Sequence, residues 1–139
     1  MSAEIVTLAV GEHLDLASDI MRLGRIRHMP VMAGDRLVGI VSQRDLFRAA
    51  ISSALTLRPA AEREWLAKIR VEEVMTTPVR TAAPYWSLAR AVQEMLSHGI
   101  GCLPVLEGER LVGLLSESDC LRSLAQLLAA SPAAAGRQP

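Results

Sequence analysis

The sequence predicts a mixed α/β (α+β) fold made of two tandem β-α-β-β-α units that pack with pseudo-two-fold symmetry. Three observations predict this fold. An internal repeat runs through the chain at a constant offset, and hydrophobic spacing alternates between strand-like and helix-like within each copy. The chain also has 139 residues, of which 50% are hydrophobic, which suits one globular unit or two very small ones sharing a core.

The two copies align without a gap when Pro30 is placed on Pro104, an offset of 104 − 30 = 74 residues. Residues 36–39, Arg-Leu-Val-Gly, recur at 110–113. The same offset superimposes further identical pairs: Thr7 and Thr81, Leu14 and Leu88, Ala17 and Ala91, Met21 and Met95, Ile26 and Ile100, Ser42 and Ser116, Asp45 and Asp119, Arg48 and Arg122. The chain is therefore two copies of one supersecondary unit.

Each copy begins with a short strand, predicted over 5–8 and 79–82. Apolar residues then recur three and four positions apart, which is typical of a helix with one buried face. These positions are Leu14, Ala17, Met21 and Gly24 in the first copy, and Leu88, Ala91 or Val92, Met95 and Gly99 in the second.

Each copy continues with two strands and a second helix. A strand opening with proline, at 30–33 or 104–107, is tolerated because the first residue of a strand can lack a ladder donor. Gly34 and Gly108 lie in predicted hairpin turns over 33–36 and 107–110. The strands "LVGIV" and "LVGLL" follow, and the second helix is expected to begin near Ser42 or Ser116.

Residues 51–73 connect the copies. Pro59 breaks the helix that precedes it, and residues 60–69 predict a separate short helix with Trp65 and Leu66 on its apolar side. The resulting division is a first copy over 1–58, a linker helix over 59–73, a second copy over 74–128, and a tail over 129–139 that we expect to be disordered.

Composition excludes several classes of function. Lys+Arg and Asp+Glu are both 15, so no basic patch indicates nucleic-acid binding, and 3% aromatic residues provide no stacking platform. No apolar run reaches membrane-spanning length and no signal peptide is apparent. Two cysteines are too few for a disulfide framework, so we expect a cytoplasmic protein with free thiols.

No catalytic or metal-binding pattern is apparent. His98 and Cys102 are four residues apart, but no third ligand or orienting carboxylate completes a metal or nucleophilic site. Walker A, GxGxxG and HExxH motifs are absent. We therefore expect no enzyme activity, metal or cofactor, and Cys102 is interpreted as a core thiol.

The Ser-x-x-Asp pattern at Ser42 and Asp45, repeated at Ser116 and Asp119, marks a strand that runs into a helix. Exposed N–H groups and the helix dipole favour phosphate at such a junction. A carboxylate one turn into the helix could accept two hydrogen bonds from a ribose diol. The same pattern is an ordinary capping arrangement, so ligand binding and capping both stay open.

Two full copies of these signatures resemble a CBS-domain pair, or Bateman module, over residues 1–128. The segments that carry the resemblance are "MPVMAGDRLVGIVSQRDL", "LPVLEGERLVGLLSESDC" and "VEEVMTTPVRTAAP". The connector "LTLRPAAEREWLAKIRVEEVM" also resembles that of short stand-alone bacterial pairs of the acetoin-utilisation-like kind. The resemblance implies a non-catalytic regulatory sensor that binds adenosine compounds in the cleft between the copies, and a flat disc-shaped dimer.

The resemblance also implies roles for individual residues. Asp45 and Asp119 would hold ribose, and Ser42 and Ser116 would lie near phosphate. The remaining candidates in the first copy are Arg27 and His28, which would approach phosphate or be merely solvated; Gly101 and Cys102 replace them in the second copy. Thr7 and Thr81 would contact base or ribose, or be ordinary strand residues, since Thr is common in strands.

The two sites are expected to differ in their frames. Met1 aligns with Met75, so the first copy lacks a counterpart of "VEEV". Residues 75–80, which include Thr76, Thr77 and Arg80, would frame the Asp45 site, and residues 2–7 would frame the Asp119 site. We expect the Asp45 site to be the better formed one.

The function predicted from the sequence is a regulatory sensor of AMP, ADP or ATP, with S-adenosylmethionine or NAD as less favoured ligands. The alternative is a ligand-independent interaction or dimerisation module, motivated by the shortened first copy and by Gly101 and Cys102. Predicted partners are an effector protein, since no effector domain is attached, and a second copy of the chain, with neither nucleic acid nor membrane. The homodimer is predicted from apolar residues beyond one helical stripe: Ile20, Met21, Leu23, Leu121, Leu124 and Leu127.

Overall fold

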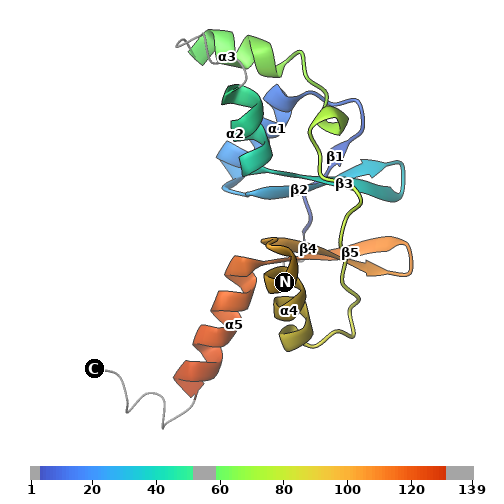
Figure 1. Ribbon diagram of the computed structural model, residues 1–139, viewed down its shortest axis with the longest axis vertical. Coiled ribbons are helices and arrows are strands. Elements are labelled where there is room, and N and C mark those ends of the chain that lie inside the picture. The colour runs from blue at the N-terminus through green and yellow to red at the C-terminus, as the bar shows by residue number, and fades with distance from the viewer. Residues whose placement is uncertain (1–3, 52–58, 131–139) are drawn as a thin grey trace. The chain divides into compact units, whose positions relative to one another are not determined.

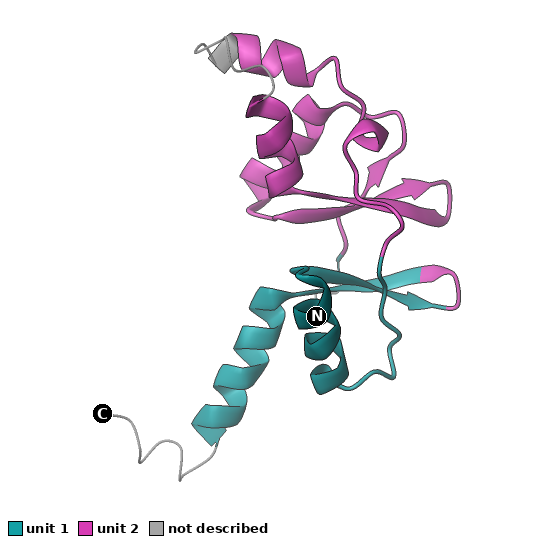
Figure 2. Cartoon of the chain, in the orientation of Figure 1, with its two compact units in different colours: residues 1–4, 80–107, 111–139 teal, residues 5–79, 108–110 magenta. Residues whose placement is uncertain are grey.

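The computed structural model describes residues 4–51 and 59–130 and has the predicted α/β architecture (Figure 1). The described residues form two compact units (Figure 2). One unit holds residues 5–79 together with 108–110, and the other holds Glu4, residues 80–107 and the remainder up to Ala130. Within the described residues, no helix is long and apolar enough to cross a membrane.

The first copy contains a three-stranded sheet in the order β1 (Leu8–Ala9), β2 (His28–Ala33), β3 (Arg36–Ser42). Strand β1 runs parallel to β2, and β2 runs antiparallel to β3. The first strand was predicted over 5–8, but only Leu8 and Ala9 pair with β2, so it is shorter and lies later in the chain. Gly34 adopts a φ of 61° in the β2–β3 turn, as its turn position predicts.

Two helices, α1 (Leu14–Gly24) and α2 (Gln43–Ile51), pack in the core of this copy. The predicted apolar stripe of α1 is confirmed at Leu14, Ala17 and Met21, which are its buried residues, whereas Gly24 at its end is exposed. They join a buried cluster that also contains Met29, Val31, Val41, Leu46, Ala49, Leu66 and Val71.

The connector packs against the first copy through α3 (Pro59–Leu66). The Trp65 indole donates to the Ala49 carbonyl at 3.0 Å. Arg63 donates to both carboxylate oxygens of Asp19 at 2.7 Å, and this pairing lowers the pKa of Asp19. The helix was predicted over 60–69, but α3 ends at Leu66, so the prediction is three residues too long at its end. After Leu66 the chain turns, and the Ile69 carbonyl accepts from the Leu14 amide at 2.9 Å.

The chain after α3 continues along the first copy. The short 3-10 helix η1 (Val71–Glu73) begins at the fully buried Val71, whose amide donates to the Glu12 carbonyl at 2.8 Å. Thr76 then pairs antiparallel with Ile40, with N–H to carbonyl distances of 2.9 and 3.2 Å. The residue that forms this edge beside β3, Thr76, comes just after the connector, at the start of the second sequence copy.

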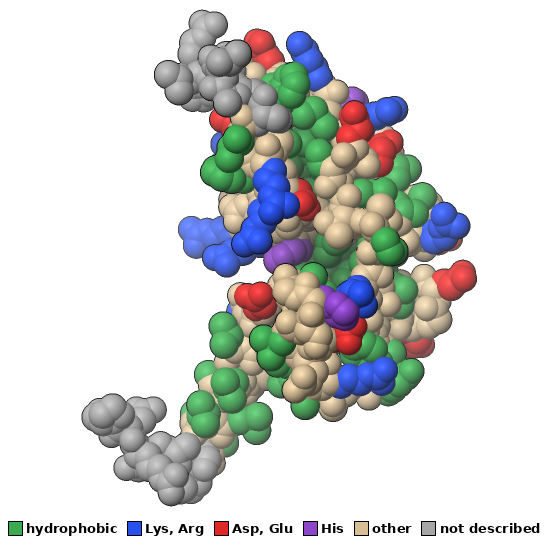
Figure 3. Space-filling model, viewed as in Figure 1, with side chains coloured by type: hydrophobic (Ala, Val, Ile, Leu, Met, Phe, Trp, Pro, Cys, Tyr) green, Lys and Arg blue, Asp and Glu red, His purple; other side chains and the backbone are tan. Residues whose placement is uncertain are grey.

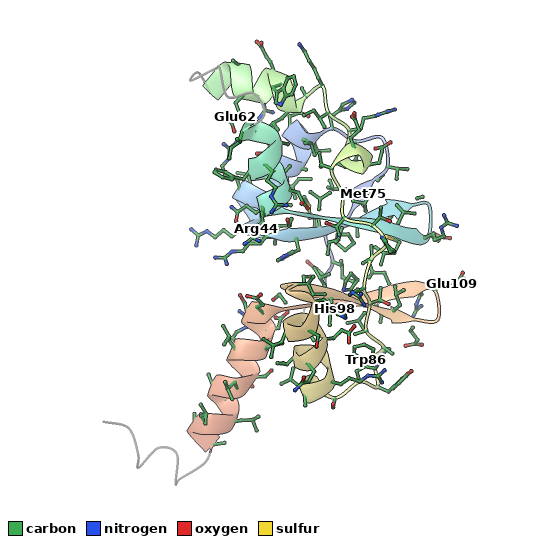
Figure 4. The ribbon with its side chains drawn as sticks, viewed as in Figure 1. Arg44, Glu62, Met75, Trp86, His98 and Glu109 are labelled. Atoms are coloured by element: carbon green, nitrogen blue, oxygen red, sulfur yellow. The ribbon has the colours of Figure 1, made fainter. Side chains whose placement is uncertain are left out.

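Gly39 is needed where this edge meets β3. A Cβ built on Gly39 would collide with the Sδ of Met75 and would lie 2.7 Å from its Cγ. Met75, which is labelled in Figure 4, occupies the space that any other side chain at position 39 would require. The Leu-Val-Gly signature of the first copy therefore has a packing reason.

The second copy contains α4 (Leu88–His98), β4 (Cys102–Glu107), β5 (Arg110–Ser116) and α5 (Glu117–Ala130). The strand predicted over 79–82 is reduced to one parallel bridge, Ala82 with Val105, at the position that matches Leu8 with Val31. Of the predicted stripe of α4, Ala91, rather than Val92, is buried together with Met95, whereas the prediction is wrong for Leu88 and Gly99, which are exposed. Their cluster includes Leu103 and Val105.

Helix α5 differs from the other helices of the repeat because none of its residues is buried. It ends at Ala130, two residues into the segment predicted as disordered, and the rest of that predicted tail lies outside the described residues. Its exposed leucines are Leu121, Leu124, Leu127 and Leu128.

Candidate functional site

The residues predicted to bind ligand in the first copy meet where β3 ends and α2 begins. His28 pairs with Ser42 across the sheet. The Gln43 amide donates to the Arg27 carbonyl at 2.8 Å, which fixes the start of α2 beside the start of β2. Thr76 pairs with Ile40, two residues before Ser42. We call Arg27, His28, Ser42, Asp45 and Thr76 the first-copy site.

Ser42 and Asp45 cap the start of α2 reciprocally. The Asp45 amide donates to the Ser42 hydroxyl at 3.1 Å, and the Ser42 amide donates to Oδ2 of Asp45 at 2.8 Å. The capping interpretation of Ser-x-x-Asp is thus realised. It uses one oxygen of the carboxylate, and among the described residues Oδ1 has no hydrogen-bond donor. Capping and an acceptor role toward a ligand are therefore compatible.

Three exposed arginines belong to segments that meet at the start of α2: Arg44 and Arg48 in the helix itself, and Arg27, whose carbonyl accepts from the Gln43 amide. None of them forms an ion pair with another residue in the described part of the chain. Figure 3 shows basic side chains gathered over the end of the unit where α2 begins, and Figure 4 labels Arg44 there. Sequence reasoning missed Arg44, although its position inside Ser-x-x-Asp places it in the first turn of α2.

The second-copy site consists of Gly101, Cys102, Ser116, Glu117 and Asp119, where β5 runs into α5. Ser116 and Asp119 repeat the capping bonds at 2.8 and 3.2 Å. The Ser116 hydroxyl also donates to Oδ2 of Asp119 at 2.9 Å.

Arg122 makes the second copy different from the first. Its guanidinium donates to Oδ1 of Asp119 at 2.6 Å, so both carboxylate oxygens are occupied. Burial by itself would raise the pKa of Asp119, but the bonds from Ser116 and Arg122 outweigh it, and that pKa is lowered. The matching residue Arg48 forms no such pair with Asp45.

Glu117 lies against the start of β4. Its amide donates to the Gly101 carbonyl at 3.0 Å, as Gln43 does to Arg27 in the first copy. A Cβ built on Gly101 would lie 2.9 Å from the Glu117 carboxylate oxygen. A carboxylate therefore occupies the space beside residue 101 that the absence of a side chain leaves open.

Cys102 is a core thiol, as predicted, with 6% of its surface exposed. Burial, and secondarily the charge of Asp119, raises the pKa of Cys102 to about 12. Burial also raises the pKa of Cys120, which is only half-buried.

We expect a disulfide reagent at pH 8 to label Cys120 of the native protein well before Cys102, and to label both thiols in denaturant. The reason is that the thiolate is the reacting form and Cys102 stays protonated and buried. Because its folded pKa lies above the unfolded value of 9.0, its contribution to stability is complete below pH 9 and is lost as pH rises toward 12. Equal labelling rates for the two native thiols would contradict this assignment, and Cys102→Ala identifies the slow one.

The other predicted site residues are placed as follows. Thr77 follows Thr76 and is exposed, and Thr7 is exposed just before β1. Arg80 and Thr81 belong to the other compact unit, where Arg80 pairs with Glu94 at 3.5 Å. The structure therefore brings Arg27, His28, Ser42, Asp45 and Thr76 together, while ligand roles for the remaining threonines and Arg80 stay predictions. No group of three His, Cys, Asp or Glu residues suited to a metal is found among residues 4–51 and 59–130.

Comparison with known proteins gives consistent matches. The family model described as "CBS domain" matches residues 1–52 and 71–126. A structure described as that of an acetoin utilization protein (AcuB) from Vibrio cholerae is 36% identical, covers 93% of this chain and 89% of that one, and has a TM-score of 0.75. A structure described as that of a signal-transduction protein with CBS domains from Burkholderia ambifaria MC40-6 is 30% identical, covers 89% of this chain and 85% of that one, and has a TM-score of 0.76.

The CBS domain pair of protein MJ0100, solved in complex with 5-methylthioadenosine and S-adenosyl-L-methionine, is 25% identical. It covers 91% of this chain and 93% of that one, with a TM-score of 0.73. Among curated relatives, MJ1225 of Methanocaldococcus jannaschii is 30% identical over 128 residues, which is 90% of this chain but 45% of that protein. The A-adding tRNA nucleotidyltransferase of Geobacter sulfurreducens is 30% identical over 122 residues, 12% of its length.

Proposed function

The chain belongs to the CBS-domain family, and from that premise we propose that it is a regulatory module that binds an adenine nucleotide and has no catalytic activity. The observation that carries the proposal is the first-copy site. A buried strand ends at a helix start, and Oδ1 of Asp45 lacks a donor among the described residues. A ribose hydroxyl is a donor that such an oxygen accepts strongly, because the acceptor is charged.

The charge beside this carboxylate favours a phosphorylated ligand. Arg27, Arg44 and Arg48 are exposed and unpaired among the described residues, and guanidinium groups bind phosphate oxygens well. The MJ0100 pair, in complex with 5-methylthioadenosine and S-adenosyl-L-methionine, supports the adenosine part of the ligand. We therefore favour AMP, ADP or ATP over S-adenosylmethionine or NAD, with Thr76 and Thr77 as further contacts.

Calorimetric titration and thermal melting with AMP, ADP, ATP, S-adenosylmethionine and NAD test this function. At a hundredfold excess over its dissociation constant, a ligand that binds only the folded state stabilises it by about 2.7 kcal/mol. We expect an increase in melting temperature with at least one nucleotide. Absence of heat and of any melting shift at millimolar concentration of all five compounds would contradict the proposal.

A ligand-independent interaction module is the second candidate, and the exposed leucines of α5 are the observation that favours it. The two candidates differ in one measurable property. A module that needs no ligand would have the same melting curve in the presence and absence of each nucleotide. It would also bind its partner protein equally well whether or not a nucleotide is added. An effector protein that receives the signal is part of the first proposal as well. The free thiols Cys102 and Cys120 support a location in the cytoplasm.

We expect the protein to form a homodimer, because α5 is a helix of 14 residues with no buried side chain. An isolated helix of that length is marginal in water and needs packing to persist. Leu121 is 65% exposed and Leu127 is 65% exposed, and a two-fold dimer is the commonest way to cover such a surface. Light scattering at micromolar concentration should give twice the chain mass of 15.0 kDa.

The double variant Leu121→Ser/Leu127→Ser should shift this mass toward that of one chain. Leu96→Ser, on α4, is the control, because Leu96 is 73% exposed and is not among the residues from which the dimer is predicted. A single-chain mass for the wild-type protein would refute the homodimer.

A further inference from the structure

Two copies that share a Ser-x-x-Asp signature would be expected to bind two equivalent ligands, but three of five matched pairs of residues around that signature differ, and with them the net charge. In the first copy these positions are Arg27, Gln43, Arg44, Asp45 and Arg48, with a net charge of +2. In the second copy they are Gly101, Glu117, Ser118, Asp119 and Arg122, with a net charge of −1. This difference of three charges favours binding of a negatively charged phosphate in the first copy and disfavours it in the second.

The hydrogen bonds differ in the same sense. Oδ1 of Asp45 has no donor among the described residues, whereas Oδ1 of Asp119 accepts from Arg122 at 2.6 Å. A ribose diol would have to displace the guanidinium of Arg122 before it could bond to that oxygen. The side chain of Asp119 is 14% exposed, so little of it can be reached from another direction.

The Glu117 carboxylate is a second obstacle to a nucleotide, because it would repel the phosphate. Its carboxylate stands against Gly101, where the first copy has Arg27. A phosphate at the start of α5 would meet a negative charge, whereas a phosphate at the start of α2 would meet Arg27 and Arg44. Two unit charges near a protein surface interact strongly enough at short range to change affinity about tenfold or more.

From these observations, and resting on the proposed function, we propose that Arg122 and Glu117 close the second-copy site to nucleotides. The chain then binds one nucleotide, through Asp45. Arg122 acts by occupying the diol acceptor, and Glu117 acts by repelling phosphate.

Titration calorimetry with AMP measures the stoichiometry directly. The wild-type protein should bind one AMP per chain, and Asp45→Ala should weaken that binding event about ten- to a hundredfold. The double variant Glu117→Gln/Arg122→Ala restores the residue that the first copy has at position 43 and frees Oδ1 of Asp119. It should show a second AMP per chain, with affinity for that second site raised about tenfold or more over wild type.

A matched change in the first copy tests the charge effect separately. Gln43→Glu places a carboxylate where the second copy has one, and should weaken AMP binding about three- to tenfold. Adenosine lacks the phosphate, so its affinity should change less than about twofold. Equal losses for AMP and adenosine would indicate a structural effect and would overturn the role assigned to the charge.

Two AMP molecules bound with similar affinity to the wild-type chain would overturn this inference and leave the proposed function standing. The same holds if the double variant still binds one AMP, or if Asp119→Ala rather than Asp45→Ala weakens the wild-type binding event. Absence of AMP binding to both the wild-type protein and the double variant would overturn the inference and the AMP form of the proposed function together.

Discussion

Asp45→Ala is expected to lower the affinity for AMP about ten- to a hundredfold. Hydrogen bonds to a charged group contribute about 1.5–3 kcal/mol, and this range corresponds to that loss of affinity. The variant should also lose about 0.5–2 kcal/mol of folding free energy, because the Ser42 amide loses the acceptor that it has in Oδ2. Titration calorimetry and urea denaturation measure the two effects on one sample.

Asp45→Asn separates these effects. Asparagine keeps one oxygen, which can still accept from the Ser42 amide at the position where Asp45 does so at 2.8 Å. Its amide nitrogen is a donor and cannot accept from a ribose hydroxyl. We therefore expect near-normal stability with an affinity loss close to that of Asp45→Ala. If Asp45→Asn binds AMP as the wild-type protein does, Asp45 is only a cap and its ribose role is wrong.

Gly39→Val is expected to reduce the free energy of unfolding by about 1–3 kcal/mol, a typical cost of overpacking a filled site. The valine Cβ would lie 2.7 Å from the Cγ and 3.1 Å from the Cβ of Met75, so a rotation of the methionine tip does not relieve the contact. The midpoint of urea denaturation measures the loss.

The double variant Gly39→Val/Met75→Ala is the control for Gly39→Val. Truncating Met75 removes the atoms that collide with the valine. The double variant should therefore lose less free energy of unfolding than the sum of the losses in Gly39→Val and Met75→Ala. Additive losses in the double variant would show that Gly39 and Met75 do not share the space described above. A Gly39→Val protein as stable as wild type would contradict the packing argument itself.

The repeat and the hydrophobic spacing sufficed to predict most elements, because each depends on residues close together in the sequence. The stripe Leu14, Ala17 and Met21 is buried as predicted, and Gly34 forms the predicted turn. The short strands were less predictable. Whether Leu8 or Ala82 lies in a strand depends on pairing with residues more than 20 positions away.

The candidate site was predictable in its residue types but not in its hydrogen bonds. The Ser-x-x-Asp signature identified Asp45 and Asp119 equally, since Arg48 and Arg122 match as well. Only side-chain placement shows that Arg122 bonds to Asp119 while Arg48 does not bond to Asp45. The pairing of Thr76 with Ile40 joins segments 36 residues apart and leaves no local pattern.

The docking of the connector has a consequence for how such a chain can be duplicated or recombined. Leu66 and Val71 are buried in the first copy's core although both follow that copy in the repeat. A recombination event that transferred only residues 1–58 would produce a first copy that lacks Leu66 and Val71 from its core and lacks the sheet edge formed by Thr76. The heritable module of this chain therefore extends past its own sequence repeat. An exchange that preserves the fold must take the first copy together with the connector and the residues after it through Thr76.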